Sequence, residues 1–334
     1  YPIAEYMTDI LSFIHALPKT ETHLHLEGSL PWEKLTELDP GRFGNPPDAW
    51  RDGFRYPDFA TFETELITCA LAWFTTPERY QEAARIFFAR CLETNVRYAE
   101  VSFASGCIEA TAQDAGQVAA AIREAYPPGL EARVFMVLHR NGNTDYMRPK
   151  IEAAHRWAEL DGIDLHGTEP LPLEDWAPPL WRRFREAGKL VKAHAGEFGG
   201  PEYVRQALDE LGVSRIEHGV RAAEDPELVH RLAAEGITLD VCPISNVKLT
   251  VAPDLASHPL RRLHEAGVRC TLNTDDPLIF GNTLEDEYLA AHEHMGFTPA
   301  GLAQLARNGL QAAAVEPARR GRWLAELDGI EAPA

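Results

Sequence analysis

The first segment whose residues could do chemistry is Thr-His-Leu-His-Leu-Glu, at residues 22–27. Residues i and i+2 of a β-strand point to the same side, so His23 and His25 could bind one metal ion together. A His-x-His pair alone is weak evidence, because two hydrogen-bonded strand histidines have the same spacing. The interpretation therefore depends on whether other metal-type residues recur in a matching arrangement.

Metal-type residues do recur, each time near the end of a predicted strand. His194 and Glu197 occur in His-Ala-Gly-Glu, His218 in Glu-His-Gly, and Asp275 and Asp276 in Asn-Thr-Asp-Asp-Pro. Taken singly, His194 is explained as a core histidine and the two aspartates as a turn. Taken together, three neutral imidazoles and one carboxylate suit Zn²⁺ with an open position for water.

The elements that must position these residues follow a regular alternation. Short β-type segments alternate with amphipathic helical patterns, which predicts parallel strands. Eight such units favour a (β/α)8 TIM barrel of the α/β class, as a single domain over residues 1–334. The predicted strands are 22–27, 97–103, 133–139, 162–167, 190–196, 215–220, 237–242 and 269–274. The first crossover, 28–95, is too long for one helix and should contain extra helices.

A barrel would bring the metal-type residues together, because the carboxyl ends of all its strands surround one mouth. A zinc ion bound there would lower the pKa of its water from about 15.7 to about 7. Glu197 and His218 are the remaining titratable groups at this mouth. A carboxyl held in a dry pocket can stay protonated, so it could act as a general acid.

The composition restricts partners and compartment. A net charge of −19 disfavours nucleic acids and anionic membranes as partners. The five cysteines form no Cys-x-x-Cys pair, which is typical of reduced thiols in a cytoplasmic protein. We found neither an 18-residue apolar run nor a signal-peptide pattern, so we expect no membrane span. The sequence leaves the oligomeric state open.

Five motifs resemble the adenosine deaminase family of the amidohydrolase superfamily. They are THLHLEGSL, HAGEFGGPE, RIEHGV, CPISNVKL and LNTDDPLIFGNTLEDEY, and the resemblance runs from Pro18 to Tyr288. It implies a zinc (β/α)8 barrel that hydrolyses the 6-amino group of an adenine-type purine. Two-metal relatives bridge their metals with a lysine of strand four, and segment 162–167 has none, so we predict one zinc per chain.

The resemblance also implies a role for each matched residue. Glu197 would protonate N1 of the purine, and His218 would orient and deprotonate the water. Asp276 would hydrogen-bond N7, and the backbone N–H of Gly167 would reach N3. The implied zinc ligands are His23, His25, His194 and Asp275.

Recognition beyond the base is where this chain departs from the adenosine pattern. Adenosine enzymes carry Asp where this chain has Glu27, and Asp-Glu where it has Thr168 and Glu169. Glu27 is also common in adenine deaminases and in deaminases of 6-aminodeoxyfutalosine, a 5′-modified adenosine. Adenine-specific relatives tend to have Ser in place of Gly167, which favours a nucleoside substrate here, with free adenine as the alternative.

Other residues are open to more than one interpretation. Phe59 and Phe62 lie where the family has an aromatic lid over the base, and core packing explains them equally well. His25 and Glu27, like Phe59 and Phe62, would contact the substrate. His139, His166, His258 and the pair His292 and His294 are expected to be solvated or structural. A catalytically inactive binding protein and a zinc hydrolase for another amide or ester are the competing hypotheses.

Overall fold

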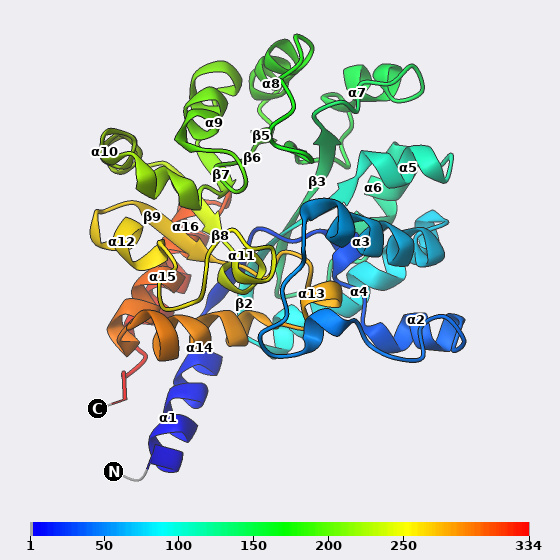
Figure 1. Ribbon diagram of the computed structural model, residues 1–334. Coiled ribbons are helices and arrows are strands. Elements are labelled where there is room, and N and C mark those ends of the chain that lie inside the picture. Colours follow the sequence, from blue (N-terminus) through cyan, green and yellow to red (C-terminus); the bar gives the residue numbers. More distant parts are fainter. Residues whose placement is uncertain (1–2, 334) are drawn as a thin grey trace.

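The computed structural model describes residues 3–333, with side chains from Asp9 onward. Its strands lie at the centre and the helices surround them (Figure 1). Both ends of the chain lie on the same side of the molecule, where α1 projects from the body (Figure 1). The strands are β1 Lys19–Glu21, β2 Val96–Ala104, β3 Glu131–His139, β4 Gly162–His166, β5 Leu190–Val191, β6 Ala193–Ala195, β7 Arg215–His218, β8 Thr238–Val241 and β9 Arg269–Leu272.

All strand pairs are parallel, in the order β1-β2-β3-β4-β5 and β6-β7-β8-β9. β5 and β6 are one strand position interrupted at Lys192, so the two sheets continue each other. The ring closes between the segment after β1 and the segment after β9. There His25 N donates to Asp275 O (3.1 Å) and Asp275 N donates to His23 O (3.1 Å). The predicted TIM barrel is thereby confirmed, with eight strand positions.

The connections are helical, as the sequence pattern predicted. The α-helices are α1 Ile3–Ala16, α2 Trp32–Leu38, α3 Phe59–Trp73, α4 Pro77–Glu93, α5 Ser105–Ala110, α6 Ala115–Glu124, α7 Arg148–Ala154, α8 Ala177–Glu186, α9 Pro201–Gln206, α10 Pro226–Glu235, α11 Pro243–Lys248, α12 Leu260–Glu265, α13 Pro277–Phe280, α14 Leu284–Met295, α15 Pro299–Ala312 and α16 Pro317–Asp328. Short helical turns cover Leu26–Gly28, Asp48–Trp50, Ala207–Leu211 and Val220–Glu224. Within residues 3–333, no helix combines the length and hydropathy needed to cross a bilayer.

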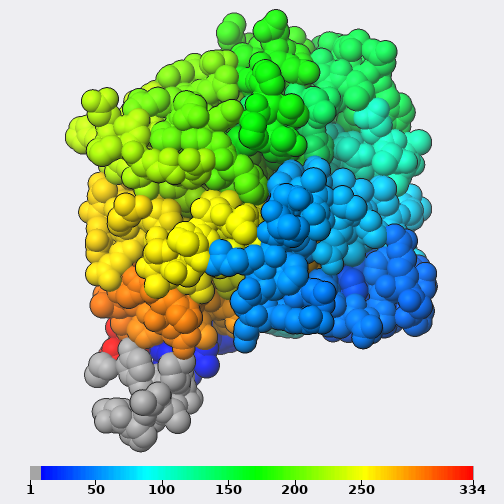
Figure 2. All heavy atoms as spheres, viewed as in Figure 1, coloured from blue at the N-terminus to red at the C-terminus, as the bar shows by residue number. Residues whose placement is uncertain are grey.

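The first crossover contains the extra helices that its length predicts. α2, α3 and α4 all lie between the first two strands. Asp58 caps α3, since its Oδ1 accepts from the backbone N–H of Thr61 at 2.8 Å. In the space-filling view these blue residues lie against the green and yellow segments of the second half of the chain (Figure 2). The first crossover thus covers part of the face to which the later strands lead.

Two strand boundaries differ from the prediction. The first strand occupies Lys19–Glu21 rather than 22–27, and residues 22–27 make only isolated bridges, from Leu24 to Asp275 and from His25 to Ser102. One isolated bridge on each side does not make a continuous ladder, so this segment is not a regular strand. The fifth strand is broken at Lys192, whose Nζ instead reaches across to Thr22 O at 2.8 Å.

The lower interior of the barrel contains charged groups rather than only the branched apolar side chains typical of this fold. Lys192 pairs with Glu217 and lies 3.2 Å from Glu100. Arg215 donates to Glu100 at 2.6 Å and to Asp240 at 2.5 Å. These five side chains are buried apart from part of Arg215, and each has an opposite charge beside it. The network lies directly beneath the histidines described next.

Candidate active site

Three imidazoles and one carboxylate converge at the barrel mouth. The ligand nitrogens of His23, His25 and His194 all lie within 4.8 Å of one another. Asp275 Oδ1 is 3.5 Å from His23 Nε2 and 3.4 Å from His25 Nε2. Among the described residues, no hydrogen-bond partner satisfies the buried Nε2 of His23. Three such nitrogens with a carboxylate are the donor set of a zinc site, so the residues fit the metal that the sequence implies.

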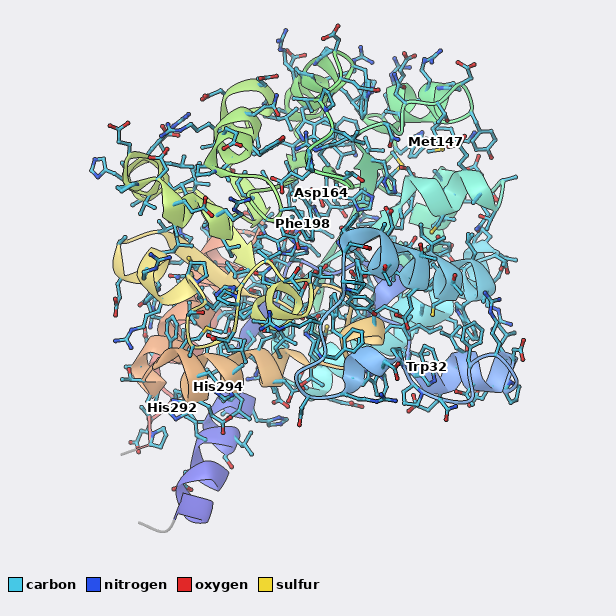
Figure 3. All side chains as sticks on the ribbon, in the orientation of Figure 1. Trp32, Met147, Asp164, Phe198, His292 and His294 are labelled. Atoms are coloured by element: carbon cyan, nitrogen blue, oxygen red, sulfur yellow. The ribbon has the colours of Figure 1, made fainter. Side chains whose placement is uncertain are left out.

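Buried carboxylates hold two of these imidazoles from behind. His23 Nδ1 lies 2.9 Å from Glu217 Oε2, and His194 Nδ1 lies 3.0 Å from Asp164 Oδ2. A carboxylate on Nδ1 fixes the ring orientation and leaves the Nε2 lone pair for a metal. Asp164 lies near the centre of the molecule (Figure 3). Neither carboxylate was identified from the sequence. Glu217 lies on a predicted strand one residue before His218, and Asp164 lies on another three residues before Gly167, so these short spacings were a usable signal.

His218 and Glu197 face the metal-type cluster. His218 Nε2 is 3.4 Å from Glu197 Oε1 and 3.9 Å from Asp275 Oδ2. His218 (φ 64°) and Asp275 (φ 65°) both have left-handed backbone conformations, which are unusual for residues other than glycine and concentrate at functional sites. Burial and the nearby Asp275 and Glu169 carboxylates raise the pKa of Glu197 well above its usual value. This environment therefore favours the protonated form of Glu197.

The loop that carries Glu197 wraps around one carboxylate, that of Glu169. Glu169 Oε2 accepts from the backbone N–H groups of Glu197 (3.1 Å), Phe198 (2.8 Å) and Gly199 (2.7 Å). Its Oε1 accepts from Gly196 N–H. Successive N–H groups around one anion form a backbone nest. Glu169 therefore determines the path of the loop, a function that sequence reasoning did not assign to it.

A cavity of about 250 Å³ opens beside this cluster. Its polar wall includes three carboxyl groups with an oxygen that, within the described chain, is buried and lacks a hydrogen-bond partner: Glu27 Oε2, Asp276 Oδ1 and Glu197 Oε1. Burial, and then the adjacent Asp275, raise the pKa of Asp276 well above its usual value. Three acceptor or donor positions around one cavity suit a small planar heterocycle with several ring nitrogens.

The opposite wall is apolar and comes mainly from α3. Phe59 and Phe62 both line the cavity, but they are placed differently. Phe62 is buried and stacks on Phe280, with ring centroids 5.2 Å apart and an interplanar angle of 12°. Phe59 is half-buried and packs edge-on against Phe198 of the Glu197 loop, at 5.1 Å. Phe62 is thus mainly a packing residue, while Phe59 links α3 to the loop.

Gly167 lies at the cavity, and its neighbour is a histidine that the sequence analysis set aside. A Cβ at Gly167 (φ 97°) would lie 2.9 Å from His139 Nδ1, and one at Gly106 would lie 3.2 Å from His139 Nε2. Two glycines therefore make room for the His139 ring. His139 and His166 line the cavity, and their ring centroids are 4.1 Å apart. Both rings are therefore partly buried at the cavity rather than solvated, and a structural role for them stays a prediction.

The remaining histidines set aside lie elsewhere. His292 and His294 are on α14, away from Asp164 and Phe198 (Figure 3). His292 Nδ1 is 2.7 Å from Phe297 O. His258 is buried beneath the mouth rather than solvated, and it contacts Asn246 of the CPISNVKL motif. All five cysteines are buried and free of disulfides in the described part of the chain.

A parallel barrel whose mouth gathers three imidazoles and a carboxylate is the architecture of a metal-dependent hydrolase. A profile of the family described as adenosine deaminase matches residues 18–330. An adenine deaminase of Streptomyces coelicolor is 34% identical over 337 residues, which are 95% of this chain and 97% of the relative. One of Sinorhizobium medicae is 36% identical over 326 residues, which are 93% and 98% of the two chains.

Solved structures agree with the sequence relatives. The crystal structure of an adenine deaminase from Arthrobacter aurescens superposes with a TM-score of 0.81, at 29% identity, over 93% of this chain and 98% of that one. An amidohydrolase from Burkholderia ambifaria, described with bound Zn, has a TM-score of 0.82 at 28% identity, over 96% and 93%. The chain belongs to the adenosine deaminase family. It is a hydrolytic deaminase that acts on a C–N bond and has a metal cofactor.

Proposed function

We propose that this protein is an adenine deaminase, which hydrolyses the 6-amino group of the free base to give hypoxanthine and ammonia. One zinc ion per chain would be held by His23, His25, His194 and Asp275. We further infer that residues 1–334 form a single domain whose partner is a small purine. The buried, unpaired cysteines support a reducing, cytoplasmic compartment.

The observation that supports free adenine as the substrate is the unpaired Oε2 of Glu27. Glu27 Oε1 accepts from Tyr80 Oη (2.8 Å) and from Ala104 N–H (2.9 Å), so that half of the carboxyl is satisfied within the protein. Oε2 is buried and has no hydrogen-bond partner among the described residues, and the Glu27 residue lines the cavity. Free adenine has an N9–H that Oε2 could accept. A nucleoside has carbon on N9, and it would leave this buried oxygen without a partner.

Asp276 also supports a base placed with its N9–H at Glu27. Asp276 and Glu27 are close enough to interact electrostatically, and a Cβ at Gly28 would overlap the Asp276 carboxyl. In the N9–H form of adenine, N7 is an acceptor and N9 a donor on the same five-membered ring. A protonated Asp276 would donate to N7 while Glu27 accepts from N9. The two carboxyls therefore complement the free base.

The sequence favoured a nucleoside, partly because Gly167 replaces a serine of adenine-specific relatives. Packing explains this glycine without reference to ribose, because a side chain at residue 167 would meet the His139 ring. The relatives from Streptomyces coelicolor and Sinorhizobium medicae are both named adenine deaminase. These observations favour the alternative over the nucleoside, which remains without support from the comparisons.

In the proposed reaction, a few side chains carry out the proton transfers. The zinc ion, when bound, would supply an acidified water and electrostatic stabilisation at C6. Glu197 donates its proton to N1, which makes C6 electrophilic, and the water oxygen bonds to C6. The first water proton passes to His218 Nε2 or Asp275 Oδ2 and then to N6. The C6–N6 bond breaks as the hydroxyl proton returns to Glu197, and ammonia and hypoxanthine result.

The test is a comparison of kcat/KM for adenine, 9-methyladenine, adenosine, 5′-methylthioadenosine and 6-aminodeoxyfutalosine. Loss of the 6-amino group changes the ultraviolet absorbance, so all five can be followed in the same way. We expect adenine to exceed each 9-substituted compound by about 100-fold, since an unpaired buried group costs about 1–3 kcal/mol. A nucleoside that matches or exceeds adenine would refute the proposal.

A further inference from the structure

Behind His218 lies a chain of buried hydrogen bonds that the proposed reaction does not use. Leu260 N–H donates to His258 Nδ1 at 3.1 Å. His258 Nε2 is 3.1 Å from Asn246 Oδ1, and Asn246 Nδ2 is 3.1 Å from His218 Nδ1. His218, Asn246 and His258 are 1%, 0% and 3% exposed, so water does not compete for these contacts. Asn246 belongs to the CPISNVKL motif, to which the function above assigns no role.

The backbone N–H of Leu260 sets the direction of every bond in this chain. A peptide N–H only donates, so His258 Nδ1 must be the acceptor and cannot carry a proton. The neutral His258 ring then carries its proton on Nε2 and donates it to Asn246 Oδ1. Burial lowers the pKa of His258 to about 3, in agreement with a neutral ring.

The same logic continues through the amide. With Oδ1 facing His258, the Asn246 amide presents its Nδ2–H to His218, so His218 Nδ1 must accept. The reversed amide would require a His258 ring that accepts at both nitrogens, which a neutral imidazole does not do. A neutral His218 that accepts at Nδ1 carries its proton on Nε2.

We propose that the Leu260–His258–Asn246 chain holds His218 as the Nε2–H tautomer, which makes Asn246 and His258 positioning residues of the active site. The inference rests on the proposed function for its catalytic consequence only. Asn246 and His258 lie outside the residues that line the cavity, so they act through His218. His218 then donates from Nε2 toward the reacting oxygen and orients it.

This tautomer narrows the role that the sequence suggested for His218. An Nε2 that already carries a proton cannot take another from water while Nδ1 remains bonded to Asn246. The groups around Nε2 are acceptors, since Glu197 Oε1 is 3.4 Å and Asp275 Oδ2 is 3.9 Å away. Asp275 Oδ2 is thus the acceptor within reach of the water proton, and Ser245 Oγ donates to it at 2.7 Å.

The direct test is the tautomer of His218 in the zinc-loaded, full-length protein. Histidine-selective ¹⁵N labelling and long-range ¹H–¹⁵N correlation distinguish protonated from unprotonated ring nitrogens, and the His218→Gln variant assigns the signals. We expect the unprotonated nitrogen of His218 to be Nδ1. An unprotonated Nε2 would overturn the proposal, whatever substrate the enzyme uses. This readout also remains valid if the protein proves inactive on adenine.

A variant that reverses the chain tests the consequence. In Asn246→Asp, a carboxylate accepts from both His258 Nε2 and His218 Nδ1, so His218 should switch to the Nδ1–H tautomer. We expect kcat to fall by about 100-fold or more with KM and zinc content almost unchanged, since a wrong tautomer lowers kcat by about 10⁴ in a serine protease triad. A switched tautomer with retained or increased kcat would show that His218 acts as a base.

One control variant and one substitute variant complete this test. Asn308→Asp is the matched control, because Asn308 is also buried but donates to Cys270 O and does not line the cavity. It should leave the His218 signals and kcat unchanged. If Asn246→Asp does not fold, His258→Gln removes the acceptor that Leu260 requires and lets the Asn246 amide rotate. Both tautomers of His218 should then appear, and a single unchanged Nε2–H signal would contradict the proposed chain.

Discussion

The two walls of the cavity are built differently. On the barrel side, His194 and His218 line the cavity and His23 lies beside them, and Nδ1 of His23, His194 and His218 lies beside the buried groups Glu217, Asp164 and Asn246 respectively. On the side of α3, the wall is apolar and is joined to the rest of the site by contacts such as the one between Phe59 and Phe198.

This difference separates reaction from recognition. Side chains that move protons or hold a metal must be oriented closely, and a buried polar group beside Nδ1 of each of these histidines restricts the ring. The apolar wall only has to exclude water and match the shape of the base. Glu27 is the exception on the recognition side, because its carboxyl is fixed by Tyr80 and Ala104 and still presents a free oxygen. Changes on the barrel side should therefore affect kcat, and changes on the other side should affect KM or substrate choice.

Removal of the metal should have the largest effect. A chelator should abolish activity, because the three histidines and Asp275 then lack the ion that would activate water. Added Zn²⁺ should restore activity, whereas Mg²⁺ should not, since imidazole ligands favour Zn²⁺ and Mg²⁺ prefers oxygen. Activity and bound metal are measured on the same samples. Full turnover in metal-depleted protein would contradict the assignment of the barrel side.

Replacement of Glu197 by Gln should come next. The amide cannot donate a proton to N1, so we expect kcat to fall by about 10³-fold or more while zinc stays bound. Elemental analysis of the purified variant checks the metal. Full activity in Glu197→Gln would remove Glu197 from the acid role and leave the barrel side without a proton donor.

Glu169 tests whether the loop needs its anion. Glu169→Ala removes the acceptor of four backbone N–H groups, and a loop displaced by about 1 Å can lower kcat by about 100-fold. Hydrogen exchange of the amides of 196–199 should accelerate. Asp175→Asn, an exposed carboxylate in the same β4–α8 connection, is the matched control. If Glu169 acts only through Glu197, the double variant Glu169→Ala, Glu197→Gln should have almost the same kcat as Glu197→Gln alone. A further fall in kcat as large as that of Glu169→Ala by itself would refute this coupling.

Glu27 should change substrate choice rather than chemistry. In Glu27→Gln, the amide oxygen still accepts from Tyr80 and Ala104, so the amide NH₂ takes the place of Oε2. Two donors, this NH₂ and the N9–H of adenine, would then face each other. We expect kcat/KM for adenine to fall by about 10–100-fold, since an unpaired buried donor costs about 1–3 kcal/mol. The value for 9-methyladenine, which lacks the N9 proton, should not fall. Equal losses on both substrates would place Glu27 in the chemistry instead.

The two phenylalanines of α3 should give the smallest effects on turnover. Phe59→Ala should raise KM several-fold at constant kcat, since it removes a half-buried ring from the cavity wall and its contacts with Phe62 and Phe198. Phe62→Ala should instead reduce the free energy of unfolding by about 3–5 kcal/mol, because it removes a buried, stacked ring. Thermal unfolding and steady-state kinetics distinguish the two. A large fall of kcat in Phe59→Ala would mean that α3 positions the Glu197 loop.

Much of the fold was predictable because its signals are local. Six of the eight predicted strands overlap the observed ones closely, since each is a short apolar run bounded by helical patterns. The first and fifth strands differ because residues of these segments make long-range contacts that no local pattern encodes. Residues 22–27 bridge to β2 on one side and to the Asp275 segment on the other, and Lys192 turns toward the interior of the barrel.

The sequence alone determined the family and the set of metal-type residues, because His-x-His, His-Ala-Gly-Glu and Asn-Thr-Asp-Asp-Pro are local patterns whose meeting point follows from barrel topology. Only the tertiary structure showed that Glu27 keeps one carboxyl oxygen free, that His139 occupies the space beside Gly167, and that Leu260 N–H orders the bonds to His218. Each of these depends on contacts between segments far apart in the chain. Spacing along the sequence does not encode the direction of a side chain or of a hydrogen bond, and these directions decide which purine fits.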